Sequence, residues 1–260
     1  MNRFTSKTFT SSGSWICPAG INTVIVYGMG GGGAGEFGAI GESLTGGHGG
    51  IGGCANNLQP VILSVVPGTS YPITVGAGGV MPNSALSGNG GDTSFGALMT
   101  WVGASGGKSD TLNFMEYSSG GLGQSFFQTS SAVGHIFTGM TGWASGGAGA
   151  VGNNNDPTFL AKIGQCGSSG IPSGKGGAPI ATTNGGNGGG GASGCNMINS
   201  GKGGDGGNGA FSINSAAVGT TPAANTGAGG GGGGGGKSGG GIGARGGDGG
   251  SGLLIVMWVE

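Results

Sequence analysis

Apolar and β-branched residues gather near the two ends of the chain and predict β-strands there. Residues 8–28 contain strand-like stretches separated by turns at 12–13 and 18–20, and residues 22–27 are rich in β-branched and aromatic side chains. The closing run, 253–259, has the length of one strand and does not alternate with polar residues, which indicates burial on both faces. We expect it to pair with residues 22–27 and so to bring the two ends of the chain together.

Two central stretches carry the same strand pattern. Residues 61–79 have two β-rich arms on either side of Pro67 and Gly68, where proline presets φ and glycine accepts a positive φ. This pattern predicts a β-hairpin. Residues 88–107 alternate glycine with two short strand-like pieces, one around Phe95 and one over 99–102.

Glycine determines the pattern of the remaining chain. It makes up 75 of the 260 residues and falls mostly in runs, such as 227–252. Such a run cannot propagate a helix, where each glycine costs about 1 kcal/mol relative to alanine, and it cannot pack a pleated strand. Two interpretations remain: flexible linkers, or extended helices of the polyproline-II type that hydrogen-bond to neighbours of their own kind.

The second interpretation has a physical basis. A helix with three residues per turn has no internal hydrogen bonds, so its N–H and C=O groups point outward. Without Cβ atoms, two such helices can approach closely and exchange N–H···O=C bonds. Ordering each residue costs about 1–2 kcal/mol, so several runs must stack side by side to form a stable array.

We therefore predict a mainly irregular, all-β fold made of a single glycine-rich domain over residues 1–260. A small β-rich base, from 7–28, 61–75, 93–102 and 253–259, would hold a stacked polyglycine-II sandwich built from 28–53 and 103–252. Short, dissimilar inserts separate the runs, as expected for a scaffold with variable loops at its ends. The inserts that we expect to bind are 108–118, 124–145, 153–163 and 210–226, with 36–45 and 80–87 as further candidates.

Composition and charge exclude several classes of protein. Glycine clusters instead of recurring every third residue, and there are 9 prolines, which excludes collagen. Because 7% of the residues are charged and 35% are hydrophobic, ordinary disorder is disfavoured. The net charge of −1 gives no electrostatic basis for binding nucleic acid or an anionic membrane. Since no apolar run reaches 18 residues and the first residues lack a secretory signal, we expect a chain made in a cytosol and not inserted in a membrane.

Few residue types could carry metal or redox chemistry. His48 and His135 are the two histidines, too few for a metal cluster, and neither has an evident partner for general-base catalysis. We expect no cofactor and no metal. The four cysteines form no CxxC pair, which favours buried thiols over disulfides and does not fit a zinc site: Cys17, Cys54, Cys166 and Cys195.

Two glycine-rich patterns are similar to known ligand sites. Asp92, Asp205 and Asp248 each lie among glycines, which could indicate calcium. No Gly-Gly-x-Gly-x-Asp series recurs, so we expect their carboxylates to cap turns or to accept hydrogen bonds from exposed N–H groups. Residues 231–238 match the phosphate-binding P-loop expression, but that loop joins a strand to a helix, and the sequence predicts neither beside it.

Large side chains in the inserts are the informative candidates for binding. Each could pack under an edge of the array as part of a small satellite core. Aromatic residues on rigid loops are, however, also the usual anchors of binding surfaces, and we expect several to be exposed together at one end. We predict binding contacts from ten residues: Phe114, Met115, Tyr117, Phe126, Phe127, His135, Ile136, Phe137, Phe159 and Phe211.

Four motifs carry a resemblance to a known family; they are FTSSGSWICPAGINTVIVYGMGGGGAG, LSVVPGTSYPITVGAGG, GGDTSFG and the terminal GGDGGSGLLIVMWV. The chain resembles the glycine-rich domain of bacteriophage tail-fibre proteins, and its later runs resemble the tip adhesins of T-even-like phages. In those adhesins, polyglycine-II helices stack in a sandwich and variable loops select the bacterial receptor. T-even-like tip adhesins carry a sizeable N-terminal attachment domain, whereas here the glycine-rich unit begins near residue 8.

The resemblance implies a receptor-binding adhesin at the tail-fibre tip of a virion, made in the host cytoplasm. The implied partners are a bacterial outer-membrane protein or surface glycan, and a phage tail-fibre or baseplate protein. Neither nucleic acid nor membrane insertion is implied.

Two other functions remain open. A structural glycine-rich module of a virion or surface coat would need no specific receptor, so exchanging its inserts would leave host range unchanged. An enzyme such as a glycan hydrolase would need two carboxylates about 5–10 Å apart. The 9 acidic residues are scattered singly along the chain, so we do not expect an enzyme.

Overall fold

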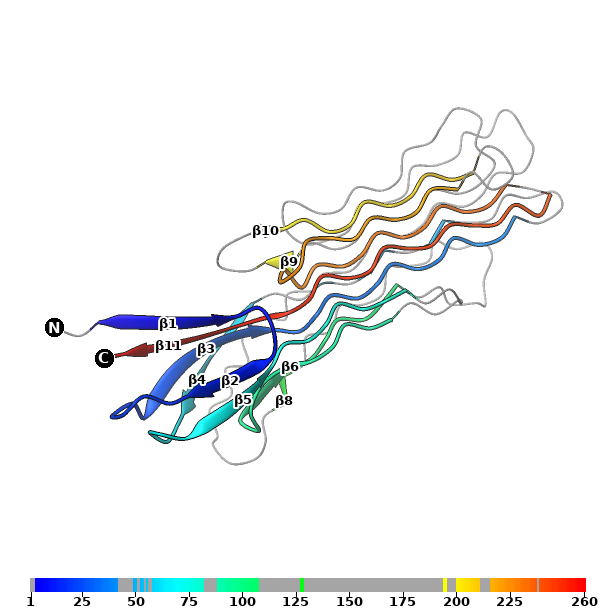
Figure 1. Ribbon diagram of the computed structural model, residues 1–260. Helices are drawn as coiled ribbons and strands as arrows, with labels where there is room; N and C mark the ends of the chain where they lie inside the picture. The colour runs from blue at the N-terminus through cyan, green and yellow to red at the C-terminus, as the bar shows by residue number, and fades with distance from the viewer. Residues whose placement is uncertain are drawn as a thin grey trace.

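Two antiparallel β-sheets stand at one end of the molecule, and glycine-rich segments run away from them side by side (Figure 1). Both termini lie at the sheet end. Within the described residues there is no α-helix, and hence no helix long and apolar enough to cross a membrane. The prediction of a β-rich chain is confirmed. The computed structural model describes residues 3–41, 49–50, 52–53, 55, 58–81, 88–107, 127–128, 194–195, 200–210, 216–237 and 239–260.

The first sheet joins the two ends of the chain. Its antiparallel strands lie in the order β1 (Phe4–Phe9), β11 (Leu253–Val259), β3 (Thr23–Met29) and β4 (Gln59–Ser64). β11 pairs with β3 from Leu253↔Met29 to Met257↔Ile25, which confirms the predicted pairing of the closing run. The first four residues of β11 are all buried, as its unbroken apolar pattern indicated.

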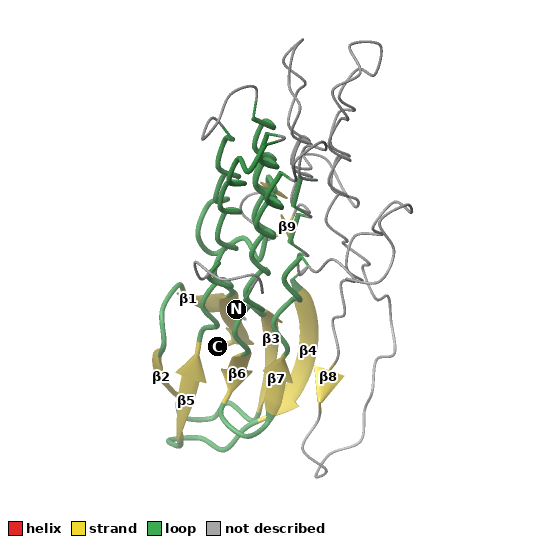
Figure 2. Cartoon of the chain, turned by 90° about the vertical axis from the view of Figure 1, so that its right-hand side faces the viewer, coloured by secondary structure: helices red, strands yellow, loops and turns green. Residues whose placement is uncertain are grey.

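The second sheet has five strands, again antiparallel. In order they are β2 (Gly13–Ile16), β5 (Ser70–Thr74), β6 (Thr93–Phe95), β7 (Met99–Trp101) and β8 (Phe127–Gln128). The two strand-like pieces predicted within 88–107 are therefore β6 and β7, which pair with each other. A separate short pair, β9 (Gly194–Cys195) with β10 (Ser200–Gly201), lies beside the glycine-rich segments (Figure 1); Figure 2 shows β9 from another side.

The predicted hairpin over 61–79 is wrong, because its two arms belong to different sheets. β4 pairs with β3, whereas β5 pairs with β2 and β6. The turn between the arms has the expected chemistry, since Gly68 has a φ of 75° and the N–H of Thr69 donates to the carbonyl of Val66. Leu63 from one arm and Ile73 from the other pack into the same core from opposite sides. The chain therefore crosses from one sheet to the other instead of folding back on itself.

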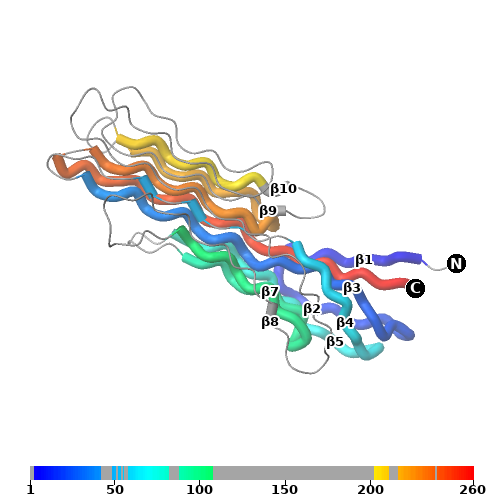
Figure 3. The backbone as a smooth tube through the Cα atoms, turned by 180° about the vertical axis from the view of Figure 1, so that it is seen from behind, coloured from blue at the N-terminus to red at the C-terminus, as the bar shows by residue number. Residues whose placement is uncertain are grey.

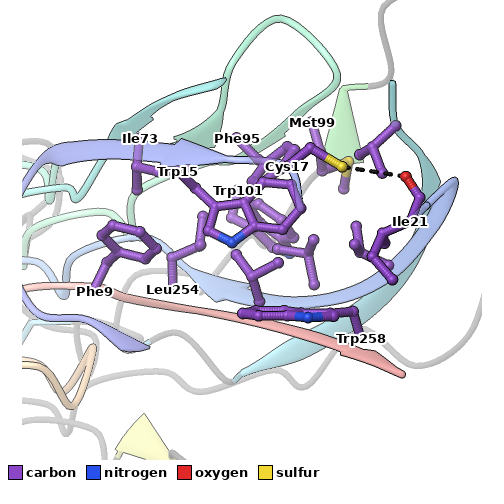
Figure 4. Close-up of a cluster of buried hydrophobic side chains, with 14 residues drawn as sticks. Phe9, Trp15, Cys17, Ile21, Ile73, Phe95, Met99, Trp101, Leu254 and Trp258 are labelled. Carbon is purple, nitrogen blue, oxygen red and sulfur yellow. Dashed lines mark hydrogen bonds between the residues drawn. The ribbon is translucent and has the colours of Figure 1, made fainter. Parts of the chain in front are cut away.

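The hydrophobic core lies between the two sheets (Figure 4). Trp15 of β2 contacts both sheets, with its ring centroid 5.8 Å from that of Phe95 and 5.6 Å from that of Trp258. Burying a large apolar side chain stabilises a fold by about 1.5–3 kcal/mol. The other buried members come from both sheets and their connections: Phe9, Cys17, Ile21, Val24, Val26, Val65, Ile73, Met99, Trp101, Leu254 and Val256.

Beyond the sheets, the described chain forms extended segments that bond to one another through their backbones. We call these segments the glycine array. Figures 1 and 3 show them running side by side away from the sheets. The segments are 30–41, 49–50 with 52–53, 75–81, 88–92, 102–107, 202–210, 216–222, 226–237 and 239–252.

The hydrogen bonds within the array repeat every three residues. Segment 30–41 donates to segment 239–252 through four bonds of 2.8–2.9 Å: Gly32 to Gly250, Gly35 to Gly247, Gly38 to Ala244 and Gly41 to Gly241. This antiparallel register is the same as that of β3 with β11, where Met29 faces Leu253. The register is therefore continuous from the sheet into the array. Within the array, the hydrogen bonds between these two segments recur every three residues, which differs from the spacing in a β-ladder.

Segment 226–237 is surrounded by other segments of the array. It exchanges hydrogen bonds with five of them, and successive residues bond in different directions. Close approach requires glycine here, because a Cβ on Gly234 would lie 1.9 Å from the carbonyl oxygen of Asn208. Three consecutive residues show the rotation: Gly230 donates to Gly33, Gly231 donates to Thr220, and Gly232 accepts from Gly207.

We predict that Gly207→Ala lowers the free energy of unfolding by about 1–3 kcal/mol, because its Cβ would lie 1.9 Å from the backbone oxygen of Ala217. The control is Asn208→Ala on the same segment, which adds no atom and should change the free energy by less than about 0.5 kcal/mol. Denaturant unfolding followed by tryptophan fluorescence measures both. Equal effects of the two substitutions would contradict the close packing of the array.

Candidate binding surface

The array has a distal end, farthest from the sheets and from both termini (Figure 1). The hydrogen-bond register identifies the residues that lie there, since the N–H of Gly41 donates to Gly241, that of Gly236 to Ala39, and that of Ala210 to Gly235. Five described segments run outward, away from the sheets. They are 30–41, 75–81, 102–107, 202–210 and 226–237.

Most of the ten predicted contact residues lie outside the described part of the chain. The exception is Phe127, whose backbone is placed in β8 and pairs with Trp101 at the edge of the second sheet. Phe127 therefore belongs to the sheet end. The nine residues outside the description are Phe114, Met115, Tyr117, Phe126, His135, Ile136, Phe137, Phe159 and Phe211.

The insert predicted at 210–226 is not one loop. The N–H groups of Ala217, Gly219 and Thr220 donate to carbonyls in other segments, so residues 216–222 form part of the array. Residues 223–226 turn back at the sheet end, where the N–H of Asn225 donates to Ser251 Oγ. Ala210, which precedes the undescribed residues 211–215, lies at the distal end.

Within the described residues, the array is stepped. Segments 88–92 and 102–107 reach the level of Ala34, which donates to Gly88 and accepts from Gly107, whereas segment 30–41 continues for seven more residues. Beyond the step, larger side chains replace glycine: Ile40 and Ile242 are 63% and 56% exposed, and Phe37 is partly buried. These three residues form an apolar surface near the distal end.

An ion pair holds the outer end of segment 75–81. Arg245 and Asp248 pair with each other, Arg245 Nε donates to the Met81 carbonyl at 2.9 Å, and the Met81 N–H donates to Asp248 Oδ1 at 2.9 Å. Both backbone groups of Met81 are thus bound. This fixes the position at which the chain enters residues 82–87.

The carboxylates of Asp92 and Asp248 act as predicted. Asp92 Oδ1 accepts from the N–H of Gly103, and Asp248 Oδ1 accepts from Met81. Asp205 pairs with Lys202 at 2.6 Å. Across the described ranges, no group of three or more His, Cys, Asp or Glu residues is placed to hold a metal ion. His48 and His135 lie outside those ranges.

The P-loop match at 231–238 lies within the array. The N–H groups of Gly231, Gly233, Gly234 and Gly236 donate to carbonyls of neighbouring segments, so they are not available to a phosphate. In the described residues 239–260, no helix follows. The match is thus a consequence of glycine content.

Cys17 is a buried free thiol, as expected, and its Sγ donates to the carbonyl of Ile21 at 3.2 Å (Figure 4). Burial raises the pKa of the Cys17 thiol by desolvation, which disfavours the reactive thiolate. The predictions for the side chains of Cys54, Cys166 and Cys195 lie outside the described residues.

A second apolar surface lies at the sheet end. Here an open hollow of about 460 Å³ is lined by Phe4, Ile25, Ile62, Met257 and the strand residues around them, with no charged side chain. Phe4 and Ile62 are largely exposed. The polar residues that line the hollow are Asn22 and Thr23, which are uncharged.

One sequence signal for the array was missed. Lys202, Asp205 and Asn208 are spaced by pairs of glycines, and all three side chains lie at or near the surface. Arg245, Asp248 and their neighbours repeat the spacing in segment 239–252. This x-Gly-Gly pattern follows the three-residue spacing of the hydrogen bonds in the array, and it could have located both segments from sequence.

A family model described as a glycine-rich domain matches residues 5–259. No curated protein matches the chain.

We predict that Asp248→Ala lowers the free energy of unfolding by about 1 kcal/mol, because it leaves the buried Met81 N–H without an acceptor. Lys202→Ala is the matched control, since Lys202 forms an exposed ion pair of the same i,i+3 spacing and should change stability by less than about 0.5 kcal/mol. Denaturant unfolding of both variants is the measurement. A larger effect from Lys202→Ala would show that the Met81 contacts contribute little.

Proposed function

We propose that this chain, which belongs to the glycine-rich domain family, is a receptor-binding adhesin at the tip of a bacteriophage tail fibre. The observation that carries the proposal is the repeated outward course of the array. Segments that leave the sheet end lead to inserts of unlike sequence, and backbone bonds that need no particular side chain hold these segments. Such a scaffold can present variable loops without changing its own structure.

We infer that the segments are polyglycine-II helices stacked in a sandwich. The three-residue repeat of the hydrogen bonds supports this, because a polyproline-II helix has three residues per turn and directs its backbone groups outward. The rotation of bonding direction at residues 230, 231 and 232 supports it as well.

A rigid scaffold favours recognition. Loops whose ends are fixed before binding lose less conformational entropy in the complex. Met81 illustrates this, because its N–H and its carbonyl are both bound immediately before residues 82–87. The proposed receptor is a bacterial outer-membrane protein or surface glycan, and the sheet end, which carries both termini, would face the tail-fibre or baseplate protein.

Binding without catalysis fits the described side chains. Asp92 and Asp248 are bound to backbone N–H groups, and Asp205 is paired with Lys202. All three carboxylates thus take part in contacts within the array, whereas glycoside hydrolysis requires a pair of carboxylates on either side of the scissile bond. We therefore propose a binding protein and not an enzyme. A structural virion module without a receptor is the second candidate, favoured by the extent of backbone bonding in the array.

Replacement of residues 129–145 by a Gly-Ser linker, which leaves β8 in place, tests the adhesin proposal. We predict that the purified chain binds some strains of a bacterial panel and that the replacement abolishes this binding, because the segment holds His135, Ile136 and Phe137. Flow cytometry with the labelled protein is the measurement. Val66→Ser, at an exposed apolar position of the sheet end, is the control and should bind as the unmodified chain does.

The outcomes separate the two candidates. Selective binding that survives the replacement would assign recognition to other inserts. Absence of binding to every strain, by a protein whose cooperative unfolding shows it to be folded, would favour the structural module.

A further inference from the structure

Segment 75–81 fits between segments 30–41 and 239–252 and bonds to both. Gly252 and Gly249 donate to the carbonyls of Gly76 and Gly79, and Gly79 donates to the carbonyl of Gly32, each at 2.8 Å. The donors are three residues apart, as elsewhere in the array. Met81 is the last described residue of segment 75–81, whereas its two neighbours continue toward the distal end.

The same series of backbone groups continues past Met81. Along segment 239–252, the N–H groups of Gly246 and Gly243 follow that of Gly249 at intervals of three residues toward the distal end. Along segment 30–41, the carbonyls of Gly35 and Gly38 follow that of Gly32 at the same interval. In the part of the chain that the structure describes, none of these four groups has a hydrogen-bond partner, although all four glycines are buried. We call these four groups the open edge. Buried backbone groups without partners cost stability, so a strand that paired with them would be favoured.

A row of Cβ atoms lies along this edge. Gly31 faces segment 75–81 so closely that a Cβ on it would lie 2.0 Å from the carbonyl oxygen of Ala77. Because the bonding of this segment repeats every three residues, Ala34, Phe37 and Ile40 present their Cβ atoms on the same side as Gly31. Glycine is thus replaced on this row from residue 34 onward, near the level of the last described residues of segment 75–81.

The sequence after Met81 agrees with this. The residue three positions after Gly79 is Pro82, which has no N–H to donate to the Gly35 carbonyl. The ion pair of Arg245 with Asp248 also binds Met81 at this point.

We propose that Phe37 and Ile40 close the open edge, preventing the array from accepting a further glycine-rich strand, including one from a second copy of the chain. Unpaired edges of β-sheets are protected in a comparable way, by side chains and prolines that block the addition of a strand. Here the blocking group is the Cβ itself, because on this row a Cβ would meet the neighbouring backbone, as the 2.0 Å separation at Gly31 shows. This role does not depend on the adhesin proposal.

Two double variants test the role of the Cβ atoms. Phe37→Gly with Ile40→Gly removes the Cβ atoms. Phe37→Ala with Ile40→Ala removes the rest of each side chain but keeps the Cβ atoms. The probe is the acetylated and amidated peptide Gly-Ala-Gly-Gly-Ala-Gly-Gly, which repeats the pattern of residues 76–79. We expect the glycine variant to bind it at least about tenfold more tightly than the unmodified chain or the alanine variant, as measured by NMR titration. A peptide with N-methylglycine at each glycine lacks those N–H donors and should not bind.

Amide exchange and sedimentation give independent readouts. On peptide binding to the glycine variant, the amides of Gly243 and Gly246 should become protected, and without peptide this variant should self-associate. Equal binding by the glycine and alanine variants, or no binding by a folded glycine variant, would overturn the proposal.

A single substitution tests the same row if the glycine variant does not fold. Gly31→Ala places a Cβ against segment 75–81 and should at least about tenfold accelerate exchange of the Gly249 and Gly252 amides, which bond to that segment. Asn208→Ala, on a different segment, should leave both rates unchanged. Unchanged exchange at Gly249 and Gly252 in Gly31→Ala would show that the row does not control access to the edge.

Discussion

Backbone hydrogen bonding between segments that carry no Cβ is the interaction on which this structure depends. Ordering a residue costs about 1–2 kcal/mol, and a hydrogen bond contributes a net of about 0.5–1.5 kcal/mol. Each bond is shared between two segments, so a single pair of glycine runs would not be stable. Segment 226–237, with five bonded neighbours, shows the arrangement in which the balance becomes favourable. The β-rich base contributes the apolar burial that glycine cannot.

Glycine runs cannot fix their own register, because a shift by three residues reproduces the same backbone bonds. Side chains elsewhere supply the missing information. The pairing of β3 with β11 is set by a packed core and passes its register to segments 30–41 and 239–252. Polar side chains fix further positions, such as Asn89 Oδ1, which accepts from Gly106, and Asp92 Oδ1, which accepts from Gly103.

The sequence predicted those features that are encoded in side-chain patterns. The unbroken apolar run of β11 and the β-branched residues of β3 were sufficient to predict their pairing and the burial of β11. The hairpin over 61–79 was wrong because the turn residues specify a change of direction but not which sheet receives each arm. The insert at 210–226 was mistaken for a loop, since Ala217 and Thr220 enter the array through backbone groups that every residue carries. The predicted contact residues other than Phe127 lie outside the described chain, so the receptor-contact prediction remains untested.

The unbroken register from β3 and β11 into the array has a mechanical consequence. Tension between the distal end and the two termini runs along both segments at once, because each continues directly into a strand of the same antiparallel pair. The hydrogen bonds that join the two segments lie across the direction of the applied force. The force is therefore shared among all of these bonds and does not break them one at a time from one end. The two hydrogen-bonded segments therefore transmit force together from the distal end to the sheet end.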